Sequence, residues 1–92
     1  MGYQWDAAKA RANARKHGIE FADAVGAIED SFAITLDDPH PTEERYLNLG
    51  VDFQGRIIVV NWVLRGDDMR LISARPATAA ERRLYTEGQD HA

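Results

Sequence analysis

The sequence contains no cysteine, which excludes disulfide bonds and thiolate metal sites within the chain. It has no long apolar run either: the longest, residues 57–64, includes Asn61 and is far shorter than the roughly 20 residues that span a bilayer. The first residues contain no apolar segment of the signal-peptide kind. We therefore expect a soluble, cytoplasmic protein without a membrane anchor.

Basic residues are outnumbered, because 11 Lys and Arg stand against 15 Asp and Glu, for a net charge of −4. Residues 1–18 hold four basic residues and one acid, residues 19–55 hold one basic residue and nine acids, and residues 56–92 hold six arginines and five acids. This segregation predicts a basic face and an acidic face on one small body. The acidic middle is suited to binding a basic partner.

The chain has the size of one small domain. Its 92 residues are 45% hydrophobic, which is typical of a folded protein. No internal repeat or linker divides it. We therefore treat residues 1–92 as one domain, with a tail that frays from about residue 88.

The first half of the chain predicts two helices. Asp6 is a favourable N-cap for a helix that runs to about His17, with Gly18 in the position of a C-cap. Apolar residues at helical spacing predict a second helix over about residues 20–30. Residues 2–5 offer a weak strand and residues 32–36 a better one, and the prolines at 39 and 41 end the pattern.

The second half predicts a β-meander followed by a helix. Alternation indicates strands over residues 44–51, 56–65 and 69–76, the middle one apolar on both faces, as a central strand is. Thr78 and Glu81 have the spacing of a capping box for a short C-terminal helix. We expect an α+β fold in which two N-terminal helices pack on an antiparallel sheet of about four strands, with the other sheet face partly open.

Arginines cluster on the last two predicted strands. Arg65 ends one strand and Arg70 begins the next, with Ser73 and Arg75 further on. Guanidinium groups grip phosphates through paired hydrogen bonds and stabilise developing negative charge. Strict alternation places Arg70 and Arg75 on opposite faces of the last strand, so both reach one phosphate only if the strand twists or bulges. The alternative is that these arginines pair with neighbouring acids at the surface.

Acid–base groups stand at two other places. His17, after Lys16 at the end of the first helix, can serve as a general base or acid, or can simply favour the helix end. Glu44, at the start of a strand, can take a proton from a ribose 2′-hydroxyl or orient an arginine, whereas we interpret Glu43 as a solvated residue. The histidines at 17, 40 and 91 lack the spacing of metal ligands, so we expect no metal site and no other cofactor.

Several motifs, taken together and in order, resemble the BrnT family of bacterial toxins. In the N-terminal part they are Trp5-Asp6, Lys9, Asn13, the string KHGIEF over residues 16–21, and Ala24. In the C-terminal part they are Glu44-Arg45, Gly50, IIVVNWVLR over residues 57–65, LISARPAT over residues 71–78, Glu81-Arg82 and Tyr85. The likeness runs from about residue 3 to residue 85, and Ala7 stands where relatives often have proline.

The resemblance implies a RelE-like α+β fold and a metal-independent ribonuclease that arrests translation as the toxin of a type II toxin–antitoxin system. It also implies a BrnA-like, DNA-binding antitoxin that covers the toxin in a hetero-oligomer and represses the shared operon. At the matching positions we expect catalytic roles for His17, Glu44, Arg65, Arg70, Ser73 and Arg75. We expect RNA contacts from Lys9, Lys16, Arg45, Arg82 and Tyr85.

These roles suggest cleavage by attack of the RNA's own 2′-hydroxyl on the adjacent phosphate. The strand arginines would hold the phosphate, and His17 or Glu44 would act as the base. Arg82 or Tyr85 would assist the leaving oxygen. A rival hypothesis is a catalytically silent module that binds the antitoxin and tunes operon repression. Direct DNA contact is disfavoured, because no recognition helix is visible.

Overall fold

The computed structural model describes residues 2–38 and 42–90. Pro39, His40, Pro41 and His91, on which some expectations above rest, lie outside the described residues. The elements are β1 (Tyr3–Gln4), α1 (Ala7–His17), α2 (Phe21–Glu29), β2 (Ile34–Asp38), β3 (Arg45–Val51), β4 (Ile57–Arg65), β5 (Asp68–Pro76) and α3 (Ala79–Asp90). None of the helices in this part of the chain is long and apolar enough to cross a membrane.

The sheet has five strands in the order β1-β5-β4-β3-β2, so the expected count of about four was too low. Strands β2 to β5 form the expected antiparallel meander, but β1 pairs with β5 in parallel and makes the sheet mixed. The two residues of β1, Tyr3 and Gln4, lie beside Met69 and Arg70. A strand this short gives almost no periodic signal, and its pairing depends on contacts across most of the chain.

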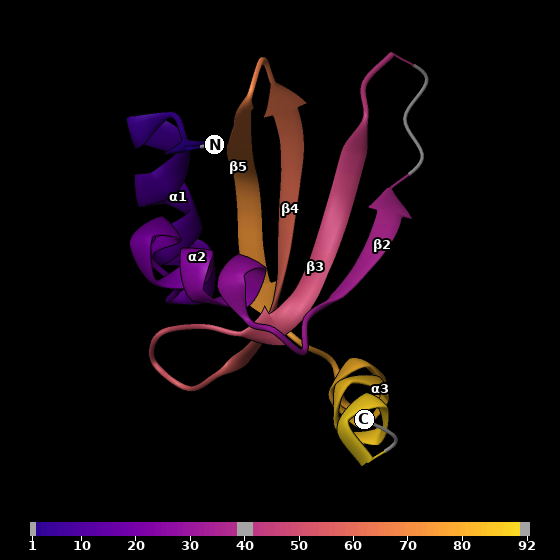
Figure 1. The fold of residues 1–92 in the computed structure, drawn as a ribbon. Coiled ribbons are helices and arrows are strands. Elements are labelled where there is room, and N and C mark those ends of the chain that lie inside the picture. The colour runs from indigo at the N-terminus through magenta and orange to yellow at the C-terminus, as the bar shows by residue number, and fades with distance from the viewer. Residues whose placement is uncertain (1, 39–41, 91–92) are drawn as a thin grey trace.

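Helices α1 and α2 pack on one face of the sheet, as expected (Figure 1). The main core lies beneath them and includes Phe21, Ile58, Val60 and Leu71, each 1% exposed or less. Helix α2 approaches β3 so closely that a Cβ at Gly50 would lie 2.5 Å from the carbonyl oxygen of Ala27. Only glycine therefore fits at position 50.

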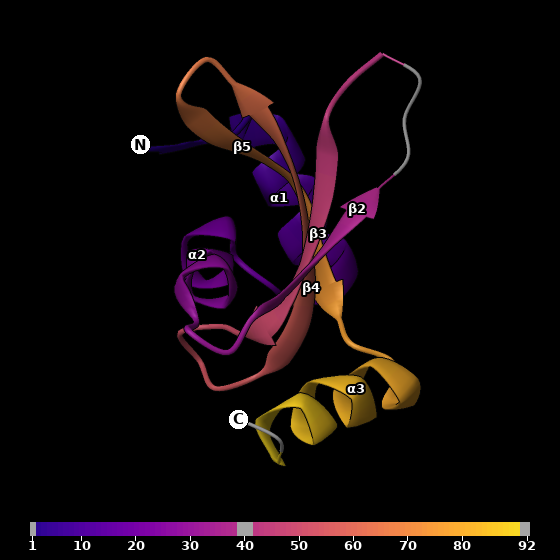
Figure 2. The ribbon, with the colours of Figure 1, turned by 45° about the vertical axis from the view of Figure 1, so that its right-hand side comes forward.

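Helix α3 packs against the opposite sheet face, at one end of the strands (Figure 2). Its buried Tyr85 joins Leu49, Val59 and Ala77 in a second, smaller core. This face was expected to be partly open, and α3 covers only one end of it. One end is covered, and the end that carries Arg45, Arg65 and Arg70 is not covered by a helix.

The helix ends follow the sequence signals. The Asp6 carboxylate accepts the backbone N–H of Lys9 at 2.9 Å, and Gly18 closes α1 with a positive φ of 71°. At α3 the capping box forms in both directions: Glu81 N–H donates to Thr78 Oγ1 at 3.1 Å, and Thr78 N–H donates to Glu81 Oε1 at 2.8 Å. Helix α3 continues to Asp90, beyond residue 88, where we expected the chain to fray.

Candidate functional site

A β-bulge in β5 decides which side chains the uncovered sheet face carries. Asn61 of β4 pairs with Ser73 and the next residue, Trp62, pairs with Leu71, so Ile72 is an extra residue without a partner in β4. The expectation from strict alternation was therefore wrong. The extra residue places Arg70 on the same face as Ser73 and Arg75. Their partners in β4 are Val63, Asn61 and Val59, which alternate along β4 and therefore share one face.

One row of side chains crosses all five strands of this face. Its members, from β1 to β2, are Gln4, Arg70, Val63, Arg45 and Asp38. Arg70 and Arg45 flank Val63, and at the usual strand spacing their backbones are about 10 Å apart. Val63 is only 3% exposed although no helix covers it, as expected if the stems of the two arginines lie over it. Arg70 donates from Nη1 to the neutral Gln4 side chain at 3.0 Å.

Arg75 is tied to α3 by an ion pair, although its side chain is 40% exposed. Its Nη1 and Nη2 atoms donate to the two carboxylate oxygens of Glu81 at 2.8 and 3.0 Å. This bidentate pair, together with the capping bonds, lowers the pKa of Glu81 from its ordinary value of 4.5 to about 2. The surface-pairing alternative considered for the arginines therefore describes Arg75 well.

Of the two adjacent glutamates before β3, Glu43 and not Glu44 faces the arginines. Glu43 Oε1 lies 3.2 Å from Arg65 Nη2, and its Oε2 lies 3.9 Å from Arg45 Nε. Glu44 is exposed and accepts a hydrogen bond from Tyr46 Oη at 3.3 Å. Tyr46 belongs to the other sheet face, where its ring stacks on Trp62.

A shallow hollow of about 240 Å³ separates α1 from the edge of β5. It brings together four predicted site residues, because it is lined by Lys9, Lys16, His17 and Ser73, along with Ala12, Asn13 and Ile72. The side chains of the two lysines and the histidine make no hydrogen bond or ion pair with any described residue. The positive charge of this hollow is thus uncompensated at short range.

Asn13 holds the two walls of the hollow together. Its buried side chain donates to the carbonyl oxygens of Ile19 and Ala74 at 3.0 Å and accepts the Ala74 N–H at 3.0 Å. These bonds satisfy the edge of β5 below the bulge and fix its distance from α1. Sequence reasoning noted Asn13 only within a motif. The available signal was a single asparagine in an alanine-rich helix.

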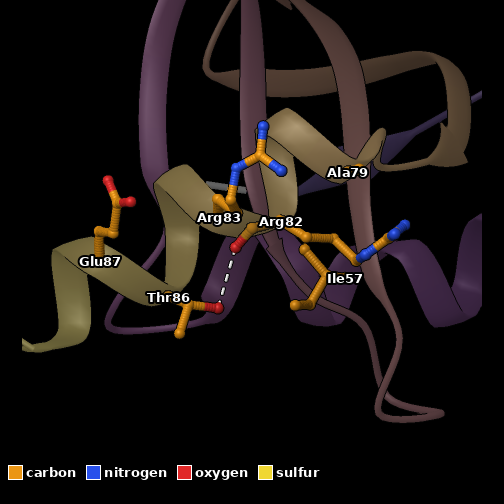
Figure 3. Close-up of a pocket in the computed structure, with 6 residues that line it drawn as sticks. All are labelled: Ile57, Ala79, Arg82, Arg83, Thr86 and Glu87. Carbon is orange, nitrogen blue, oxygen red and sulfur yellow. Dashed lines mark hydrogen bonds between the residues drawn. The ribbon is translucent and has the colours of Figure 1, made fainter.

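The remaining predicted residues, Arg82 and Tyr85, are on α3. Tyr85 is 4% exposed and donates to Asp30 Oδ2. Burial and this hydrogen bond raise its pKa to about 12. The ring is thus part of the core and not of the uncovered face. Arg82 donates to the Ala77 carbonyl oxygen at 2.9 Å, and with Arg83, Ile57, Ala79, Thr86 and Glu87 it lines a second hollow of about 460 Å³ (Figure 3).

Asn61 and Asp38 are site residues that the sequence reading did not assign. Asn61 Nδ2 donates to Asp38 Oδ2 at 2.8 Å on the uncovered face, beside the row of Arg45 and Arg70. A polar residue inside an otherwise apolar central strand was the available signal for Asn61. Among the described residues, no group of three or more His, Asp or Glu side chains is placed to hold a metal ion.

Fold and surface together define a class. This is a small α+β domain with cations and a histidine at one sheet edge, which have no partner among the described residues, and with arginines on the adjoining face; such a surface is suited to a polyanion. Residues 5–81 match the family described as the ribonuclease toxin BrnT of type II toxin–antitoxin systems. The chain belongs to the BrnT family, and a toxin of this type has an antitoxin partner.

A solved relative has a similar fold. The crystal structure of the Brucella abortus ribonuclease toxin BrnT matches this chain with 28% sequence identity and a TM-score of 0.67. The match covers 85% of this chain and 97% of that chain. A comparison with curated proteins finds no match.

Proposed function

We propose that this toxin is a metal-independent endoribonuclease of the RelE type that inhibits translation. In the proposed reaction the 2′-hydroxyl of the RNA attacks the adjacent phosphorus, and the products are a 2′,3′-cyclic phosphate and a free 5′-hydroxyl. The bulge at Ile72 carries the proposal, because Ser73 then shares a face with Arg70 while also lining the hollow of His17. Phosphate-binding and proton-transfer groups meet at one strand.

Arg70 and Arg45 are the proposed phosphate grip. Arg70 is half-buried and its partner Gln4 is neutral, so its charge remains available to a phosphate. Fixed guanidinium groups stabilise the charge that develops on the phosphorane oxygens. Arg75 contributes less, because Glu81 already occupies both of its terminal nitrogens.

His17 is the proposed general base, and Lys16 the group that assists the leaving 5′-oxygen. Both line the hollow, and neither has an acidic partner among the described residues. Glu44 is hydrogen-bonded to Tyr46 on the other sheet face, and the ring of Tyr85 is buried. Glu44 and Tyr85 therefore have no role in the proposed mechanism. Ser73 would donate its hydroxyl to a phosphate oxygen between the two groups.

Variants on α1 and β5 test the proposal with RNA cleavage in excess EDTA. His17→Ala and Arg70→Ala should each reduce the cleavage rate about 100-fold or more. Arg11→Ala is the matched control, because Arg11 lies on the same helix, is exposed, and does not line the hollow. The assignment fails if Arg11→Ala loses as much activity as His17→Ala, since the loss would then reflect helix charge alone.

The proposed partner is a BrnA-like, DNA-binding antitoxin that covers the acidic stretch of the toxin, residues 19–55. Strand β2 is the last strand of the sheet, and Leu36 on it and Phe32 before it are 46% and 54% exposed. Asp30, Asp37 and Asp38 lie close to these apolar residues in the sequence, which favours a basic partner. Size-exclusion chromatography with the antitoxin would test this: Leu36→Glu should weaken the hetero-oligomer, and Leu84→Glu, on α3 outside the acidic stretch and equally exposed at 46%, should not.

A further inference from the structure

A connected set of polar side chains lies on the uncovered sheet face between β2 and β4. Asn61 donates to Asp38 Oδ2 at 2.8 Å, and this same oxygen lies 3.9 Å from Arg45 Nε. Glu43 Oε2 also lies 3.9 Å from Arg45 Nε, and its other oxygen lies 3.2 Å from Arg65 Nη2. Arg45 thus stands between two carboxylates that both approach the same atom of its guanidinium group.

The Nε atom of Arg45 is buried and makes no hydrogen bond, since 3.9 Å exceeds hydrogen-bond range. A buried donor without a partner costs stability, so this arrangement is a poor way to strengthen the fold. The side chain is 25% exposed, and the two described carboxylates approach it at Nε rather than at a terminal nitrogen. The carboxylates therefore fix the inner end of the guanidinium group and leave its outer end to a ligand.

We propose that Glu43 is a positioning residue for RNA cleavage, with Asp38 in support. Glu43 holds Arg45 in the orientation that turns its terminal nitrogens toward the phosphate, opposite Arg70 across Val63. The carboxylate does not touch the RNA and transfers no proton. This inference rests on the proposed ribonuclease function, and it replaces Glu44 with Glu43 as the acid that serves the site.

A purely electrostatic role and a positioning role for Glu43 predict different effects of removing its charge, which makes the role testable. Removing a carboxylate beside a polyanion strengthens binding, so neutralising Glu43 should leave KM unchanged or lower it. If Glu43 orients Arg45, kcat should nevertheless fall, because charge stabilisation in the transition state depends on the position of the guanidinium group. Glu44→Gln removes the same charge one residue away, on the opposite sheet face, and is the matched control.

The experiment measures kcat and KM for RNA cleavage by wild type, Glu43→Gln, Glu44→Gln, Arg45→Ala and the Glu43→Gln/Arg45→Ala double variant. We expect kcat to fall about 10-fold or more in Glu43→Gln without a rise in KM, and to change less than about twofold in Glu44→Gln. The double variant should be no slower than Arg45→Ala, because the role proposed for Glu43 acts through Arg45, and its other bond, to Arg65, is exposed. Asp38→Asn repeats the test from the other carboxylate should Glu43→Gln fail to fold.

Two failures are distinguishable. Wild-type protein that leaves RNA intact overturns the proposed function, and the inference with it. Wild-type cleavage with Glu43→Gln as fast as Glu44→Gln, or with additive losses in the double variant, overturns the inference alone.

Discussion

Arg70 and Arg75 lie on the same face of β5, although strict alternation would place them on opposite faces, because the strand accommodates one extra residue at Ile72. The bulge also sits where β5 passes α1, so Ser73 lines the hollow that holds His17. Bulges redirect side chains at sheet edges and beside active sites. Here the bulge lets one strand serve both the arginine row and the hollow.

RNA affinity should depend on Lys16 more than on its neighbour Arg15. Both side chains are exposed, but Lys16 lines the hollow and Arg15 does not. RNA with 2′-O-methyl groups lacks the attacking hydroxyl, so it can be bound but not cleaved. With this RNA, Lys16→Ala should weaken binding and reduce the slope of the log binding constant against log salt by about 0.7. Equal losses in Lys16→Ala and Arg15→Ala would show that RNA senses only the overall charge of α1.

The Arg75–Glu81 pair should make stability fall in acid. The folded-state pKa of Glu81 is about 2, below its ordinary value of 4.5, so its contribution is complete above pH 4.5 and is lost as the pH falls towards 2. Solvent screening of this partly exposed pair limits the effect to about 1–2 kcal/mol. Urea unfolding between pH 2.5 and 6 should show a shallower pH dependence in Glu81→Gln, with Glu87→Gln as control. Identical profiles for all three proteins would contradict the assignment.

Tyr85→Phe should destabilise the protein by about 1.5–2 kcal/mol, because the Asp30 carboxylate loses the phenolic hydrogen bond while the ring stays packed. Chemical denaturation measures the change. RNA affinity should be unaffected, since the ring is buried under α3. Weaker RNA binding by a fully folded Tyr85→Phe protein would instead support the RNA contact that the sequence predicted for Tyr85.

Asn13→Ala should cost about 2–3 kcal/mol, because three backbone groups of Ile19 and Ala74 lose their partner in a buried place. Hydrogen exchange should show the Ala74 amide becoming markedly less protected, while amides in the centre of β4 change in proportion to global stability alone. Unchanged protection at Ala74 would mean that α1 does not need Asn13 to seal the strand edge.

Local signals predicted the helices, and long-range pairing explains what they missed. Asp6, Gly18 and the Thr78–Glu81 box mark helix ends because their bonds span only a few residues. The partner of Tyr85 is Asp30, 55 positions away, so its burial had no local signature. Strand β1 was too short to be paired with β5 from periodicity.

The choice between Glu43 and Glu44 shows the limit for the site. Adjacent residues of one type differ in their contacts here because β3 begins at Arg45 and its register on β4 decides which glutamate faces the arginines. Likewise, the residue types on β5 predicted an arginine site, but alternation assumed a regular strand. A single extra residue reverses every assignment beyond it.

Analysis of the RNA ends produced by purified wild-type protein in excess EDTA tests the central claim most directly. Cleavage by attack of the 2′-hydroxyl predicts fragments with a 2′,3′-cyclic phosphate and a 5′-hydroxyl, with far fewer cuts in the His17→Ala protein. Intact RNA under these conditions, or fragments that carry a 5′-phosphate and a 3′-hydroxyl, would contradict it.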